Sequence, residues 1–415
     1  MGRSSGRGRH PYLPPVKNID VQTPNVKKRL IVIAILFVIG VIALGIGLYQ
    51  SRKWEDGWKI VESDNVLGCA SEISFHYYLA GDGARERASE IATIYTQLCG
   101  RADYVYAVTA EEAVAKGAAS EAGEGEANLA NLNANPNTVL EAAPELYRTL
   151  EKLEELGTRI HLLGPVYESY DGIFSCTEDR ETVDFDPWQN PDLKEEYAQV
   201  AAFAANPDDI RIELLGGGRI CLHVSERYLA FAKEHGTRNF VDLYYLRNAA
   251  ILDDMADALR EKGWTQGYFQ SANGYGVNLL SEGEFSVNVA NGKDGIVAQL
   301  AAVPPMAFAA LRNYALTELD KQSCYTFTDG STRAKYVDQR DGLPKAAKSD
   351  LLLLSKEEGC LALAVMAATP YALEEFGEDD FPAKGLSAIW CEGINIRVAG
   401  DDVKFSEVAE GYTVE

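Results

Sequence analysis

The stretch Asp242–Leu259, DLYYLRNAAILDDMADAL, decides the fold class because a predicted strand end runs directly into an amphipathic helix there. We interpret Phe240–Asp242 as the end of the strand. Apolar side chains then recur at helical spacing and predict one buried stripe. This stripe consists of Leu252, Met255, Ala256 and Leu259. Gly263 follows at the position expected of a residue that ends the helix.

The remaining elements mix strands and helices without strict alternation, and hairpins recur. The clearest hairpin is Asp209–Val224, turning at Gly216–Gly218. Tyr167–Asp209, rich in Asp, Pro and aromatic residues, is expected to wrap the surface. The predicted class is α+β, with mixed or antiparallel sheets and packed helices. Helices are predicted at Ala84–Leu98, Pro144–Leu156, Met306–Leu319 and Glu358–Ala368. Strands are predicted at Ile73–Ala80, Gly267–Ser271, Glu284–Ala290, Cys324–Thr328 and Leu351–Leu354, with a strand pair over Ile389–Val408 that turns at Gly400–Asp402.

The N-terminal region predicts a single membrane anchor. Leu30–Tyr49, LIVIAILFVIGVIALGIGLY, is an uncharged apolar run long enough to span the hydrocarbon as a helix. Residues 1–29 are basic and expected to form a disordered cytoplasmic tail, so the positive-inside rule places residues 60–415 outside the cell membrane. A cleaved signal peptide is the alternative, but the run is too long for one and no small-x-small cleavage site follows it. An uncleaved signal anchor is therefore the better interpretation.

The net charge changes sign just after the predicted anchor. Residues 1–53 hold nine basic residues and one acidic residue, which leaves 30 basic and 61 acidic residues beyond them, a net charge of −31. Such an acidic domain argues against binding to nucleic acid or to anionic lipid. Within it, the Ala/Glu/Gly-rich residues 107–128 are expected to form a low-complexity insertion.

The seven cysteines all follow the predicted anchor, where disulfides are permitted, but their odd number and the absence of CxxC leave the pairing open. The five histidines are scattered without metal-ligand spacing, so a zinc site is not expected.

Four segments in order resemble the FAD:protein FMN transferase family, also called the thiamine-biosynthesis lipoprotein family. The first, Ala127–Asn133 (ANLANLN), lies where the family has Ser-Glu-x-Ser-x-Leu-Asn and keeps Leu132 and Asn133. Two further landmarks match at Pro144–Leu146 and Gly164–Pro165. With the spacing between them, the segments cover most of residues 65–375. Asn133 is thereby a candidate cofactor-binding residue, with an ordinary turn residue as the alternative.

The resemblance implies a membrane-tethered, extracytoplasmic enzyme that moves the FMN half of FAD onto a Thr or Ser of an exported protein, using Mg²⁺.

The second segment is the stretch Asp242–Leu259. It lies on the family pattern Asp-Leu-Gly-Gly-x-x-Lys-Gly-Tyr-x-x-Asp and keeps Asp242, Leu243 and Asp253. Glycines in such a loop let the backbone approach a ligand, and the lysine would supply positive charge for a diphosphate. Here the glycines are replaced by Tyr244, Tyr245 and Ala249, and the lysine by Asn248. Asp253 is a candidate cofactor contact, or a first-turn helix acid.

The third segment is a family Gly-Gly pair that falls on Ala272–Asn273. Gly274 and Gly276 lie nearby and are interpreted as an ordinary turn, with a looser loop of the family's kind as the alternative. The fourth is Tyr336–Pro344 (YVDQRDGLP), which lies on His-x-x-Asp-Pro-Arg-Thr-Gly-x-Pro. By resemblance its retained residues bind the cofactor, and Asp338 is the candidate catalytic residue; an Asp-Gly turn is the alternative. The retained residues are Asp338, Arg340, Gly342 and Pro344.

The family's metal ligands are missing. Its next helix carries Asp and Thr four residues apart, and the matching positions here are Cys360 and Ala364. A thiol and a methyl group do not hold Mg²⁺, which requires oxygen ligands. Mg²⁺ is therefore not expected, FAD remains the expected ligand of any retained site, and Cys360 is interpreted as a core residue.

Three functions remain open. The favoured one is a non-catalytic scaffold that binds flavin or a partner, such as an exported flavoprotein or an electron-transfer protein. The alternatives are an active FMN transferase with a rearranged site and a structural accessory of an extracytoplasmic electron-transfer system. The chain lacks the Ser/Thr-Gly-Ala-Ser/Thr acceptor motif, so it is not expected to be the flavinylated substrate.

Overall fold

The computed structural model describes residues 56–62, 72–115, 125–280, 285–302, 306–316, 319–372, 379, 381–400 and 403–415. Asp56–Glu415 forms one compact unit. The predicted anchor at Leu30–Tyr49 and its tail lie outside the described residues. Within the described ranges, no helix is both long and apolar enough to cross a membrane.

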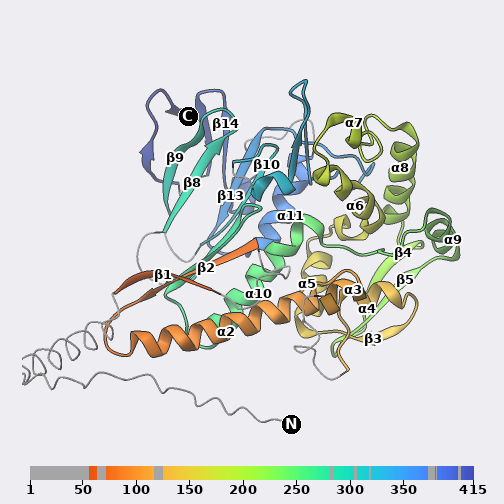
Figure 1. Ribbon diagram of the computed structural model, residues 1–415, viewed down its shortest axis with the longest axis horizontal. Helices are drawn as coiled ribbons and strands as arrows, with labels where there is room; N and C mark the ends of the chain where they lie inside the picture. Colours follow the sequence, from red (N-terminus) through yellow and green to blue (C-terminus); the bar gives the residue numbers. More distant parts are fainter. Residues whose placement is uncertain are drawn as a thin grey trace, which may run out of the picture. The chain divides into compact units, whose positions relative to one another are not determined.

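A nine-stranded sheet forms the centre of this unit (Figure 1). Neighbouring strands are antiparallel except β15 and β17, which are parallel. The order is β1 (Gly57–Val61), β2 (Ile73–Leu79), β6 (Gly267–Ser271), β7 (Tyr275–Asn278), β10 (Met306–Arg312), β13 (Asp350–Ser355), β14 (Ser387–Glu392), β15 (Asn395–Ala399) and β17 (Thr413–Val414).

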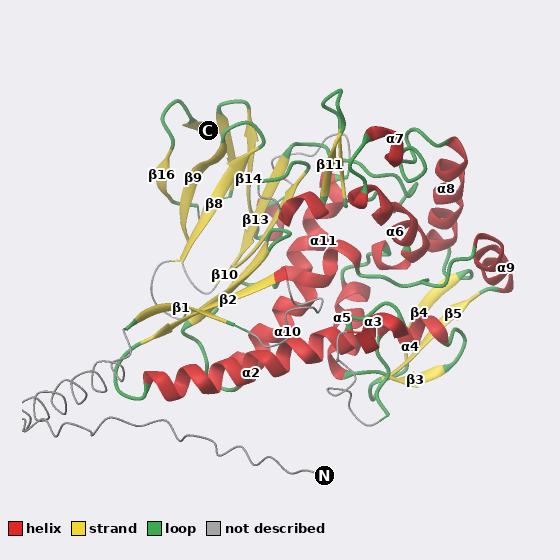
Figure 2. Ribbon diagram, in the orientation of Figure 1, coloured by secondary structure: helices red, strands yellow, loops and turns green. Residues whose placement is uncertain are grey.

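Each face of this sheet packs on a different layer (Figure 2). Helices α2 (Ala84–Val105), α10 (Arg247–Glu261) and α11 (Cys360–Tyr371) cover one face and enclose the larger core. A three-stranded sheet, β16 (Phe405–Val408), β9 (Gly295–Ala302) and β8 (Phe285–Asn291), covers part of the other face and encloses a smaller core.

The remaining elements surround the helical layer. A small sheet orders β3 (Val139–Glu141), β5 (Arg219–Val224) and β4 (Ile210–Leu214), and β11 (Cys324–Thr326) pairs with β12 (Thr332–Ala334). The helices are α3 (Ala110–Ala115), α4 (Leu129–Ala134), α5 (Pro144–Glu155), α6 (Gly164–Tyr170), α7 (Asp179–Thr182), α8 (Pro191–Ala205) and α9 (Glu226–His235). Short 3₁₀ turns occupy Ile160–Leu162, Asp171–Ser175, Tyr244–Leu246, Leu319–Gln322 and Pro382–Lys384.

The α+β class is confirmed, as are the helix after Asp242 and the hairpin turning at Gly216–Gly218. Gly263 follows α10 with a φ of +76°, a backbone conformation that favours glycine. The predicted stripe of Leu252, Met255, Ala256 and Leu259 is buried against the sheet.

Four expectations were wrong. Met306–Leu319 begins as strand β10 because this segment is buried on both faces and so lacks a strand's polar alternation. Tyr167–Asp209 forms helices α6, α7 and α8, with aromatic side chains buried in the larger core. The C-terminal strand pair turns at Gly393. Phe240–Asp242 is a loop, although its three residues are buried.

The expected insertion at residues 107–128 is partly ordered. Ala107 and Val108 are buried, α3 begins at Ala110, and Asn128 caps the start of α4. Residues 116–124 lie outside the described residues.

Candidate functional site

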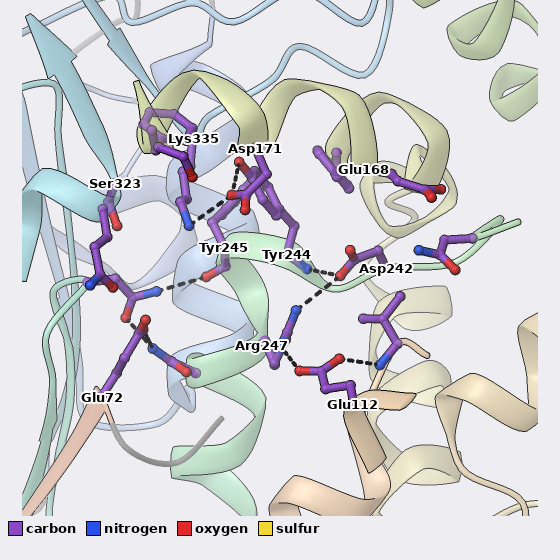
Figure 3. Close-up of a pocket in the computed structure, with 18 residues that line it drawn as sticks. Glu72, Glu112, Glu168, Asp171, Asp242, Tyr244, Tyr245, Arg247, Ser323 and Lys335 are labelled. Atoms are coloured by element: carbon purple, nitrogen blue, oxygen red, sulfur yellow. Dashed lines mark hydrogen bonds and ion pairs between the residues drawn. The ribbon is translucent and has the colours of Figure 1, made fainter. Parts of the chain in front are cut away.

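A cleft of about 710 Å³ lies beside the start of α10 (Figure 3). It brings the first part of the stretch Asp242–Leu259 together with segments that are distant in the sequence. Its size is in the range of small-molecule sites. The described residues that line it are Glu72, Val108, Glu112, Tyr167, Glu168, Asp171, Phe174, Ser175, Asn239, Asp242, Tyr244, Tyr245, Arg247, Asn248, Asn273, Gln322, Ser323 and Lys335.

Asn133 holds the loop that leads into the cleft. Its side-chain amide donates to the carbonyl oxygen of Val241 and accepts from the Val241 N–H, both at 2.8 Å. Helix α4 can present this amide because Asn128 and Asn131 form a reciprocal cap at its N-terminus. Asn133 is 6% exposed and does not line the cleft. Its observed role is to position the loop before Asp242.

Asp242 is buried at the base of the loop. Its carboxylate accepts the N–H of Tyr244 at 2.7 Å and lies 3.7 Å from Arg247, which also pairs with Glu112 at 3.2 Å (Figure 3). Burial raises the pKa of Asp242, and the nearby guanidinium of Arg247 partly offsets this. The Asp242 side chain therefore stabilises the turn through its hydrogen bond to the backbone of Tyr244.

Tyr244 stands where the family pattern has its first glycine and keeps a left-handed backbone, with φ of +46°. This conformation is costly for a residue with a side chain. The ring stacks on Tyr167 with centroids 4.5 Å apart, and its hydroxyl donates to Asp171 at 3.1 Å. Nζ of Lys335 lies 5.1 Å from the ring centroid. These contacts fix the side chain in the cleft wall.

Tyr245, at the second glycine position, is 3% exposed and meets Tyr336 edge to face at 5.3 Å. Its carbonyl oxygen accepts from Asn273 at 3.3 Å. Asn248, at the lysine position, donates to Glu72 at 2.7 Å and to Asn273 at 3.0 Å. At these two positions of the family pattern, the side chains of Tyr245 and Asn248 thus pack against or bond to other protein groups.

The cleft is acidic. Five carboxylates line it, against the two cations Arg247 and Lys335. Both cations are already paired, Arg247 with Glu112 and Asp242, and Lys335 with Asp171 at 3.3 Å. The carboxylates belong to Glu72, Glu112, Glu168, Asp171 and Asp242.

Lys335 and Asp171 were missed by the sequence reasoning. Lys335 occupies the position of the histidine in the family's His-x-x-Asp pattern, so the alignment on Asp338 already contained this signal. Asp171 follows α6 in a segment expected to wrap the surface, and nothing in its surroundings in the sequence indicates its partner.

Asp338, the candidate catalytic residue, lies outside the residues that line the cleft. It accepts from Arg340 at 2.6 Å and from Lys345 at 2.8 Å within its own turn. Burial opposes ionisation of Asp338, but the hydrogen bonds from Arg340 and Lys345 outweigh it and hold its pKa at about 2. Gly342 has φ of +74°, and a Cβ there would lie 2.7 Å from the carbonyl oxygen of Tyr197. The segment is a closed turn packed on α8.

Asp253 is also placed away from the cleft lining. Its carboxylate accepts the backbone N–H groups of Cys360 at 2.7 Å and Leu361 at 2.9 Å, the first two residues of α11. Burial raises the pKa of Asp253 to about 7, against the effect of these two hydrogen bonds. Asp253 therefore caps a neighbouring helix.

Cys360 and Ala364 are fully buried in the larger core. The Cys360 thiol contacts the carbonyl oxygen of Gly276 at 3.1 Å, and burial raises its pKa. These residues do not fit Mg²⁺. Across the described ranges, no group of three or more His, Cys, Asp or Glu side chains is placed to hold a metal ion.

The sequence matches no protein-family model and no curated protein. Its structure is similar to that of the ApbE protein from Thermotoga maritima, at 13% identity and a TM-score of 0.53, covering 85% of this chain and 97% of that one. It is also similar to the flavin transferase ApbE from Vibrio cholerae, at 13% identity and a TM-score of 0.50, covering 86% of this chain and 99% of that one. The resemblance read from the sequence is thus confirmed at the level of the fold, and the chain has the fold of the ApbE flavin transferases.

Proposed function

We propose that this chain is a single-pass, membrane-anchored extracytoplasmic protein that keeps the flavin-transferase fold without catalysing FMN transfer. Its cleft would serve to bind a flavin or a partner, such as an exported flavoprotein or electron-transfer protein. The topology rests on the apolar run Leu30–Tyr49 and the basic residues before it.

The observation that carries the proposal is the pair Tyr244 and Tyr245 at the glycine positions of the loop. Tyr244 is held by Tyr167, Asp171 and Lys335, so it cannot leave the cleft wall without breaking a ring stack, a hydrogen bond and a cation–π contact. A ligand that needs close backbone approach at this loop meets side chains instead.

Electrostatics supports the same conclusion. A diphosphate bound in the cleft would face five carboxylates, and the two cations that line it are already paired. Without compensating charge, this arrangement disfavours an anion. Of the two ligand classes, the cleft therefore favours a neutral or cationic group of a partner over FAD.

The alternative is an active transferase with a rearranged site, moving FMN from FAD to a Ser or Thr of an exported protein. The observation in its favour is the volume of the cleft, about 710 Å³, which is enough for a flavin-sized ligand. Arg247 and Lys335 would then be the cations that line the ligand site.

The test uses the full chain with FAD, with and without Mg²⁺, and an acceptor protein that carries the Ser/Thr-Gly-Ala-Ser/Thr motif. Flavin fluorescence anisotropy measures binding, and flavin fluorescence on the denatured acceptor measures transfer. We expect no covalent flavin on the acceptor in either condition.

Lys335→Met removes one of the two cations that line the cleft, and Lys348→Met is its matched control, because Lys348 pairs with Glu392 and does not line the cleft. Covalent flavin that is lost in Lys335→Met and kept in Lys348→Met would establish the active transferase instead. FAD binding without transfer would identify a flavin-binding scaffold, and absence of binding would leave the partner-binding role.

A further inference from the structure

In the described part of the chain, the face of the large sheet opposite the helices is uncovered at its β1–β2 end. The smaller core packs under β8 and β9, and its last aromatic contact in this direction is Tyr268 of β6 on Phe285, at 4.7 Å between centroids. Beyond Tyr268, three large apolar side chains are exposed: Trp58 at 46%, Ile60 at 65% and Tyr78 at 42%.

Strand register places these three side chains on one surface. Trp58 is paired with Tyr78 across β1 and β2, and Ile60 is paired with His76, which in turn is paired with Tyr268. Paired residues of antiparallel strands project from the same face. The rings confirm this, since Trp58 lies 5.7 Å from Tyr78 and 5.3 Å from Tyr268. We call Trp58, Ile60 and Tyr78 the β1–β2 patch.

The patch lies where the compact unit begins. Strand β1 starts at Gly57, and Gly81 just after β2 donates its N–H to Asp56 at 2.9 Å. Residues 50–57 separate the apolar run from Trp58. Fully extended, these eight residues span at most about 30 Å, so a membrane-embedded run would keep Trp58 within that distance of the membrane.

From these observations we infer that the β1–β2 patch rests in the interfacial region of the membrane. The inference depends on the anchor in the proposed function and adds a second, non-covalent contact that orients the domain. Tryptophan and tyrosine are the side chains that favour this region, because each has an apolar body and a polar edge.

The surrounding charges indicate which lipid surface the patch fits. The chain beyond residue 53 carries a net charge of −31, so an anionic bilayer would repel it. The neighbouring His76 ring stacks on Tyr268 at 4.6 Å, and burial lowers its pKa, which keeps it neutral near pH 7. A zwitterionic headgroup layer is therefore the expected surface.

This orientation has a consequence for the cleft. Tyr78 lies near one end of β2 and Glu72, which lines the cleft, directly precedes the other end. Six residues of strand correspond to about 20 Å, so the cleft rim stays within that distance of the patch. Partners of the cleft are then expected to be proteins held at the membrane surface.

The experiment reconstitutes the full chain in phosphatidylcholine vesicles that contain nitroxide-labelled lipid, with Trp54 replaced by Phe to remove its fluorescence. Flotation of the vesicles tests the anchor, and quenching of tryptophan fluorescence tests the patch. We expect Trp58→Phe to remove at least half of the lipid-dependent quenching. A nitroxide near the glycerol level should quench more than one in mid-chain.

Trp188 is the matched control, because it is exposed to the same extent, 46%, but belongs to the segment between α7 and α8. Trp188→Phe should leave the lipid-dependent quenching unchanged. Flotation with equal quenching in both variants would overturn the patch and leave the anchor standing, whereas failure to float would overturn both. A change in Trp58 fluorescence that depends on protein concentration and not on lipid would show that a second copy of the chain covers the patch instead.

Discussion

Tyr244 adopts a backbone conformation that usually requires glycine, and its side chain makes up for the cost through contacts across the cleft. The free-energy cost of the φ of +46° is offset by the stack on Tyr167 and the hydrogen bond to Asp171. Strain and side-chain contacts can be separated by comparing two truncations at this one position.

We expect Tyr244→Gly to be more stable than Tyr244→Ala by about 1 kcal/mol, because only glycine relieves the left-handed backbone. Both variants should be less stable than the unchanged chain, since both lose the contacts of the ring. Urea unfolding of the three proteins measures the differences. The same pair at Tyr245, whose φ is not positive, should show the opposite order; an identical order at both positions would contradict the argument.

The lowered pKa of Asp338 predicts how the stability of the fold depends on pH. Its pKa in the folded chain is about 2, below the value near 4 expected for an unfolded aspartate. Ionised Asp338 therefore stabilises the fold above about pH 4, and this contribution is lost as the pH falls from about 4 to about 2. Asp338→Asn should lower the free energy of unfolding at neutral pH, and the difference from the unchanged chain should shrink across that range. A difference that stays constant down to pH 2 would count against the ion pairs with Arg340 and Lys345.

At the scale of elements, α10 and α11 are joined by one carboxylate. Asp253 on α10 accepts the first two N–H groups of α11, and a Cβ on Gly359 would lie 2.6 Å from its Oδ2. The loop before α11 thus requires a residue without a side chain at this point, and α11 requires an acceptor from another helix because its own N-cap is Gly359.

Asp253→Ala should lower the free energy of unfolding by about 3 kcal/mol, because it leaves two buried N–H groups without an acceptor. Chemical denaturation measures the loss. Asp257→Ala is the control on the same helix, since Asp257 is exposed and pairs with Arg260, and it should change stability by less than about 0.5 kcal/mol. Equal effects of the two substitutions would show that Asp253 does not hold α11.

Elements with clear periodicity could be predicted from the sequence, and those buried on both sides could not. The stripe of α10 and the glycine turn of the β4–β5 hairpin are local signals. Strand β10 has no such signal, because Phe308 faces the smaller core while Ala309 faces the larger one. Its three alanines and one leucine are equally suited to a helix.

The sequence could predict only those residues of the candidate site that lie within a continuous sequence pattern. Asn133 and Asp242 were found because each lies in a family pattern. Their contacts depend on the fold: the Asn133 amide is hydrogen-bonded to the backbone of Val241, and the Asp242 carboxylate accepts the N–H of Tyr244. Lys335 and Asp171 meet across the cleft from distant segments, and their pairing is a property of the tertiary structure.

At the scale of the whole compact unit, two hydrophobic cores share one sheet. In β13, Leu351 and Leu353 belong to the larger core, whereas Leu352 and Leu354 belong to the smaller one, and β10 and β14 alternate in the same way. Loss of either core therefore removes support from strands on which the other depends.

We expect the compact unit to unfold in one transition. Phe285→Ala in the smaller core and Phe75→Ala in the larger core should each lower the free energy of unfolding by about 3 to 5 kcal/mol, because both side chains are buried. Far-UV circular dichroism and tryptophan fluorescence, followed through the same urea titration of the full chain, should give coincident midpoints in both variants. If β8, β9 and β16 unfold independently, Phe285→Ala will instead produce an early transition while the midpoint of the remaining signal stays unchanged, whereas Phe75→Ala will move only that later midpoint. The alternation of side chains between the two cores along β10, β13 and β14 leads us to expect the single transition.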